Sequence, residues 1–133
     1  ALDRGISINP VLNAFQMVVN EYNIDRALID KFLESMEKDL NEITYSSLAY
    51  DDYIVGSAEV VGLMCLMVFV NGDKSLYDEL EDPARRLGAA FQKVNFLRDV
   101  KADFEDLGRS YFPGVNLTNF THIEKLKIEA KVI

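Results

Sequence analysis

Residues 92–103 read QKVNFLRDVKAD, and this stretch decides how the chain is expected to fold. On a helix, Gln92, Asn95, Asp99 and Asp103 fall at successive turns and form one polar stripe. Apolar side chains flank the stripe on both sides, at positions 91, 94, 96, 97, 100 and 104. A helix that is apolar nearly all round is normally buried. The pattern therefore predicts a buried helix in which two carboxylates require partners.

Two aspartates one helical turn apart indicate a cation site. Mg²⁺ binds through one or two carboxylates and completes its shell with water and substrate phosphates, so Asp99 and Asp103 are typical of half a diphosphate site. The amides of Gln92 and Asn95 can hydrogen-bond the second ligand. The alternative is a solvated acidic face on which Arg98 and Lys101 serve as ion-pair partners. The residues alone leave both interpretations open.

Size and composition are those of one soluble globular domain. The chain has 133 residues, of which 49% are hydrophobic and 27% charged. Its formal net charge of −8, without a basic stripe interleaved with aromatic residues, argues against a nucleic-acid partner. The single cysteine, Cys65, lies in an apolar run. We therefore expect Cys65 to be a small core residue and the protein to work in a reducing, cytoplasmic setting.

Helix signals dominate and strand signals are nearly absent. Asn9-Pro10 predicts a helix start with proline at the first helical position, and a second helix is expected over residues 25–40. A third is expected from Ser47 or Asp51 to Val70. It is apolar enough to raise the question of a membrane span, but a central carboxylate, Glu59, favours a buried helix of a soluble domain.

Three further helices are expected in the second half. A short helix is expected over residues 73–80. Asp82-Pro83 then repeats the cap-and-proline signature and predicts the start of a long helix, which Gly108 ends. Thr121 and Glu124 form the capping box of a final helix. We therefore predict a single all-α domain over residues 1–133. Both ends look cut, so we expect a fragment of a longer protein.

Three further features are candidates for ligand contact. Arg109 follows the polar stripe in GRSYFP and can either bind phosphate or cap the helix C-terminus. Gly56 and Gly62 lie inside an apolar helix, where each glycine lowers helix stability by about 1 kcal/mol relative to alanine. Close helix packing or room for a long apolar ligand would offset that cost. Tyr53 could present its hydroxyl to the reacting end of such a ligand.

Two segments carry a resemblance to a known family. YIVGSAEVVGLMCLMVF (residues 53–69) and LGAAFQKVNFLRDVKADFEDLGRSYFP (residues 87–113) resemble the squalene/phytoene synthase family. That family has a tyrosine-led apolar helix, a Q-x-x-N-x-x-R-D-x-x-x-D helix and a G-R-x-Y-x-P loop, and all three occur here in order. The resemblance implies an all-α, isoprenoid synthase-type helical bundle, incomplete here at both ends. It also implies head-to-head condensation of two prenyl diphosphates.

The resemblance implies residue roles as well. Asp99 and Asp103 match the aspartates that bind Mg²⁺, which in turn holds a prenyl diphosphate. Gln92 and Asn95 match residues that line the same site, and Arg109 matches an arginine near the diphosphate. The tyrosine matching Tyr53 faces the reacting carbons. Apolar residues would wall the cavity and exclude water, namely Gly56 and Val60 with Val55, Val61, Met64 and Phe91.

Two departures from the family pattern stand out. Nothing upstream of Tyr53 matches the first aspartate-rich motif that members carry, and Ala102 stands where many have glutamate. We expect the missing motif to lie before Ala1, so that the 133-residue piece alone has little or no turnover.

Within the family we favour phytoene formation from two C20 geranylgeranyl diphosphates, since no nicotinamide-binding signal supports a reductive squalene step. Squalene or dehydrosqualene formation from C15 farnesyl diphosphate is the second possibility. A non-catalytic helical module is the alternative of a different class. Such apolar products favour work at the membrane surface, although no amphipathic anchor is evident. The sequence indicates no oligomeric state.

Overall fold

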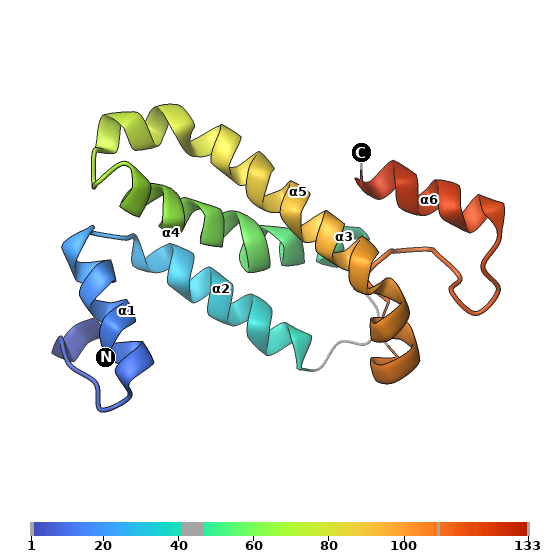
Figure 1. Ribbon diagram of the computed structural model, residues 1–133, viewed down its shortest axis with the longest axis horizontal. Coiled ribbons are helices and arrows are strands. Elements are labelled where there is room, and N and C mark those ends of the chain that lie inside the picture. Colours follow the sequence, from blue (N-terminus) through green and yellow to red (C-terminus); the bar gives the residue numbers. More distant parts are fainter. Residues whose placement is uncertain (1, 41–46, 109, 133) are drawn as a thin grey trace.

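The fold is all-α, as predicted. The computed structural model describes residues 2–40, 47–108 and 110–132, and no strand occurs among them. The helices come in the order η1 (Leu2–Arg4), α1 (Pro10–Glu21), α2 (Arg26–Asp39), α3 (Ser47–Ile54), η2 (Val55–Glu59), α4 (Val60–Phe69), α5 (Lys74–Leu107) and α6 (His122–Val132). Figure 1 shows α2, α4 and α5 lying side by side, with α4 in the middle and in contact with both neighbours.

The starts of the first two helices follow the predicted signals. Asn9 caps α1, because its side-chain oxygen accepts hydrogen bonds from the backbone N–H groups of Val11 and Leu12, and Pro10 is the first helical residue. Asp25 caps α2 by accepting from the N–H of Ala27. These two boundaries needed no tertiary contact, which is why local sequence predicted them.

The predicted third helix is present, but its middle is a π-helix. The segments α3, η2 and α4 follow one another without a break from Ser47 to Phe69, and η2 is the π-helical part. A Cβ added to Gly56 would lie 1.7 Å from Ser35 Oγ on α2, and one added to Gly88 of α5 would lie 2.8 Å from the Ala58 carbonyl oxygen. Glycine therefore permits α2 and α5 to approach η2 from two sides.

This helix is only partly buried. Val60, Leu63 and Leu66 are buried, whereas Phe69 is 83% exposed. Cys65 is also exposed, so its prediction as a core residue was wrong. It faces the groove between α4 and α5. By length and composition alone, Ala49–Phe69 is the one helical run among the described residues that could cross a membrane, a weak criterion that core helices also meet.

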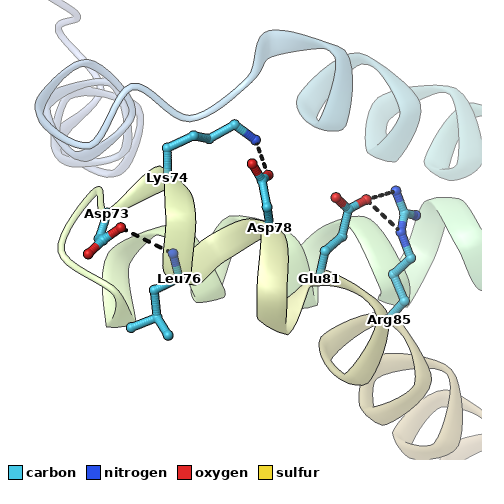
Figure 2. A network of polar contacts seen from close by, with 6 residues as sticks. All are labelled: Asp73, Lys74, Leu76, Asp78, Glu81 and Arg85. Atoms are coloured by element: carbon cyan, nitrogen blue, oxygen red, sulfur yellow. Dashed lines mark hydrogen bonds and ion pairs between the residues drawn. The ribbon is translucent and has the colours of Figure 1, made fainter.

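The long helix starts earlier than predicted. It begins after Asp73, whose side chain accepts from the N–H of Leu76 at 3.1 Å (Figure 2). The helix continues through Pro83, so the predicted cap at Asp82-Pro83 was wrong. Pro83 removes one helical hydrogen bond. Side-chain pairs one turn apart span this region: Lys74–Asp78, Glu81–Arg85 and Asp82–Arg86. The acidic residues Asp78, Glu79, Glu81 and Asp82 thus lie inside the helix.

The predicted capping box of α6 forms only in part. Thr121 Oγ1 accepts from the N–H of Glu124 at 3.4 Å, as expected. The Glu124 carboxylate instead accepts from the backbone N–H of Asn116 at 2.7 Å and from Lys127 Nζ at 2.8 Å. These bonds hold the pKa of Glu124 below its usual range. The carboxylate therefore ties α6 to the loop before it.

Candidate active site

The polar stripe lies on α5 with all four members half-buried: Gln92, Asn95, Asp99 and Asp103. Its apolar flanks are not equivalent. Phe96 is buried, but Phe91, Val94 and Leu97 are 64%, 54% and 46% exposed. The expectation of a helix buried all round was therefore wrong, and Phe91 does not wall an enclosed space. The reason is that α5 packs on α4 and η2 along one side only, where Gly88 and Phe96 lie.

Asp99 carries an ion pair with its neighbour in sequence. Arg98 donates from Nε to Asp99 Oδ1 at 2.7 Å and from Nη2 to Oδ2 at 2.6 Å. The Asp99 side chain is 42% exposed, so this is the surface pair of the alternative interpretation, and such pairs are weak. The hydrogen bonds from Arg98 lower the pKa of Asp99. The carboxylate is therefore charged at neutral pH, the form that binds a cation.

The donor set suits a hard divalent cation but does not complete its shell. Asp99 and Asp103 offer carboxylate oxygens one helical turn apart, the ligand type that Mg²⁺ takes. Within residues 2–40, 47–108 and 110–132, no three His, Cys, Asp or Glu side chains gather into a metal-binding group. The pair therefore fits at most a half-site, whose remaining ligands would have to come from water, phosphate or further carboxylates.

Tyr53 lies in a stack of aromatic rings beside the stripe. Phe96 of α5 stacks on Tyr111 with ring centroids 4.4 Å apart and planes 9° from parallel. Tyr53 of α3 lies 5.9 Å from Phe96 and 5.7 Å from Tyr111. The three rings thus come from α3, α5 and the loop that follows α5, and all are buried. Tyr53 is consequently held against the helix that carries Asn95 and Asp99.

The other candidate residues have differing surroundings. Gly56 and Val60 are buried, and Gly56 faces Ser35 closely enough that helix packing accounts for its lack of a side chain. Any contact of Gly56 or Val60 with a ligand stays a prediction. Arg109 lies outside the described residues, but its neighbours Tyr111 and Phe112 are core residues.

Comparison with known proteins decides the family. Residues 2–127 match the squalene/phytoene synthase family. The chain belongs to that family. It is 32% identical to the 15-cis-phytoene synthase of Pantoea ananas, over 92% of this chain and 41% of that protein. It is 36% identical to the 15-cis-phytoene synthase of Enterobacter agglomerans, over 78% of this chain and 34% of that protein.

A third relative is named for a different product. The 4,4'-diapophytoene synthase of Staphylococcus haemolyticus is 26% identical, over 83% of this chain and 38% of that protein. No solved structure matches the chain significantly. The chain spans about two fifths or less of the length of these curated relatives. The resemblance drawn from residues 53–69 and 87–113 is thus confirmed, and with it the all-α fold class.

The chain also has a groove beside α5. It runs between α5 and α6 and encloses about 450 Å³. Apolar residues line it, with charged side chains among them: Leu97, Val100, Phe104, Leu117, Phe120 and Ile128, with Lys101, Glu105, Lys125 and Glu129. No member of the polar stripe belongs to this lining. The groove is therefore not the cavity expected beside Asp99 and Asp103.

Two polar residues of this synthase-family chain were missed by sequence reasoning. Asp52 lies inside α3 and accepts from Lys31 Nζ and Lys38 Nζ, both at 2.6 Å. Those hydrogen bonds lower its pKa. The spacing of the two lysines on one face of α2 was a usable signal. Asp39, which accepts from Tyr111 at 3.2 Å, gave no local signal because 72 positions separate the pair.

Proposed function

We propose that this chain is the central part of a longer isoprenoid synthase domain that condenses two geranylgeranyl diphosphates head-to-head to phytoene. The carrying observation is that α5 bears the half-buried aspartate pair and also Phe96, on which the buried ring of Tyr53 packs. Family membership and the identities to two phytoene synthases support the same activity. A longer parent agrees with the share of each relative that the chain spans.

The aspartates would hold Mg²⁺, and the amides would bind diphosphate. Asp99 and Asp103 are the carboxylate ligands, while the side-chain N–H groups of Gln92 and Asn95 donate to diphosphate oxygens. The chemistry that the metal supplies when bound is neutralisation of charge on the departing diphosphate. In this scheme Asp99 exchanges its contact with Arg98 for the cation, an exchange that a weak surface ion pair permits.

The apolar side of the site protects and orients the reacting carbons. Departure of one diphosphate leaves an allylic cation, which the double bond of the second prenyl chain attacks, and loss of a proton gives a cyclopropyl diphosphate. Departure of the second diphosphate, rearrangement and loss of another proton give phytoene, so no reductant is consumed. Tyr53 turns its electron-rich ring toward the cation, and Val60 and its neighbours exclude water.

The experiment uses the complete protein that contains this chain. Geranylgeranyl diphosphate and Mg²⁺ are supplied, diphosphate release is measured, and the apolar product is identified by its absorbance and mass. Release that stops when a chelator removes the metal, together with a C40 product, is the expected result. Preference for farnesyl diphosphate in a parallel reaction would assign the C15 alternative. A folded protein that releases no diphosphate from either donor would instead be a non-catalytic helical module.

A further inference from the structure

Asp39 and Tyr111 join two segments that are far apart in sequence. Asp39 is the last residue of α2, and its Oδ1 accepts a hydrogen bond from the Tyr111 hydroxyl at 3.2 Å. Asp39 is half-buried and Tyr111 is buried. A carboxylate at the last residue of a helix is unfavourable with the helix dipole. The hydrogen bond to Tyr111 helps to offset that cost.

The acceptor sits on an element that is fixed relative to Tyr53. Lys38, the residue before Asp39, lies with its Nζ 2.6 Å from Oδ2 of Asp52, the residue before Tyr53. Lys31 binds the other oxygen of Asp52 at the same distance. Two adjacent residues of α2 thus reach toward the Tyr53 region, one by an ion pair to Asp52 and one through Tyr111. This end of α2 is therefore held in place against α3.

Tyr111 passes this constraint to Tyr53 through ring contacts. The Tyr111 ring is stacked on Phe96 and lies 5.7 Å from the Tyr53 ring at an angle of 32°. A hydroxyl bonded at one end and a ring stacked on its face leave Tyr111 little freedom to rotate. The Tyr53 ring packs against both of the other rings, so its position depends on where Tyr111 is held.

We propose that Asp39 is a positioning residue that acts through Tyr111 to set the orientation of the Tyr53 ring toward the prenyl chain. This role rests on the proposed function, in which Tyr53 faces the reacting carbons. Asp39 itself touches no substrate in this scheme. Its loss therefore changes the rate of the chemical step more than substrate binding, because a small misplacement of a reacting geometry is costly.

The test compares Asp39→Ala, Asp39→Asn, Tyr111→Phe and the double variant Asp39→Ala/Tyr111→Phe in the complete enzyme. Asp39→Ala is expected to lower kcat about tenfold and to change KM for geranylgeranyl diphosphate less than about twofold, as for a lost charge-assisted hydrogen bond. Asp39→Asn should restore most of kcat, since its amide oxygen still accepts. In the Tyr111→Phe background, Asp39→Ala should have a smaller effect than in the unaltered enzyme, because the Tyr111 donor is already absent.

Hydrogen exchange supplies a readout besides turnover. The backbone amides of residues 110–112 should exchange faster in Asp39→Ala and Tyr111→Phe and remain unchanged in Asp39→Asn. Asp30→Ala is the matched control, since Asp30 is an exposed carboxylate on the same helix and lies outside the proposed site. It should change neither kcat nor the exchange of these amides.

Three results would overturn the positioning role while leaving the proposed function intact. The first is an active enzyme in which Asp39→Ala keeps its kcat. The second is an effect of Asp39→Ala that is equally large in the Tyr111→Phe background. The third is unchanged exchange of the 110–112 amides in Asp39→Ala. Failure of the proposed function is distinguishable, because the unaltered enzyme would then release no diphosphate.

Discussion

Phe96 and Tyr111 lie face to face, with ring centroids 4.4 Å apart and planes within 9° of parallel. Phe96 belongs to the helix that carries both aspartates, and Tyr111 belongs to the loop that follows it. The stack therefore fixes where the chain goes after Gly108, whose left-handed backbone (φ 66°) ends α5. It also places Tyr53, the tyrosine of the first family motif, against the helix of the second motif.

The aspartate pair should be required for turnover and for its metal dependence. In the complete enzyme, Asp99→Asn or Asp103→Asn is expected to lower kcat at least about 100-fold. Each variant loses a charged ligand of the metal that neutralises the departing diphosphate. The Mg²⁺ concentration that gives half-maximal rate should rise in each variant. Asp106→Asn, the same charge change at an exposed position of α5, is the control. Full activity in both aspartate variants would contradict the metal assignment.

Gly56 should be needed for stability, because helix α2 packs directly on it. Gly56→Ala places a Cβ 1.7 Å from Ser35 Oγ and is expected to destabilise the protein by about 1–3 kcal/mol, as for overpacked cores. The measurement is urea unfolding. Adding Ser35→Gly should recover part of the loss by making room for the new methyl group. If Gly56→Ala unfolds at the same urea concentration as the unaltered protein, the close approach of α2 to η2 is not present in solution.

The clamp of two lysines on Asp52 should appear as an acid-dependent part of the stability. Hydrogen bonds from Lys31 and Lys38 lower the pKa of Asp52 below the ordinary 3.8. A carboxyl whose folded pKa is depressed stabilises the fold above the unfolded pKa, and this contribution is lost as pH falls below 3.8 through the folded value. The Tm of Asp52→Asn should therefore be lower than that of the unaltered protein at neutral pH. The two values should converge as pH falls below about 3.8. An offset in Tm that is the same at all pH values would rule out the clamp.

The hydroxyl of Tyr50 should be a cost to the fold. Tyr50 is fully buried, and its oxygen has no hydrogen-bond partner among the described residues. Tyr50→Phe removes this unsatisfied group without changing the ring, so we expect an increase of about 1 kcal/mol in the free energy of unfolding. Burial also raises the pKa of Tyr50 to about 12 from 10.0, so stability present below pH 10 should decline between pH 10 and 12.

The Tyr50→Phe variant should not show that alkaline decline, which separates the titration of this one residue from general alkaline unfolding. Thermal unfolding at a series of pH values measures both effects. A clear loss of stability in Tyr50→Phe at neutral pH would show that the hydroxyl has a bonding partner in solution.

The sequence by itself determined the helical class, the cap at Asn9, the start of the second helix near Asp25, and the register that puts Gln92, Asn95, Asp99 and Asp103 on one half-buried face. It did so because helical periodicity and capping act within one or two turns. Local signals failed at Asp82-Pro83, where a cap-and-proline pair lies inside a helix that Asp73 had already started. Ion pairs one turn apart accompany the helix through the proline there.

Only the tertiary structure decided which sides of these helices are covered and which distant residues meet. The exposure of Phe91, the position of Cys65 beside a groove, and the contact between Asp39 and Tyr111 depend on how α2, α4 and α5 lie together. Residues 72 positions apart share no local pattern, so their contact follows from packing alone. The physical reason is that burial is a property of the neighbours a helix acquires, not of the helix itself.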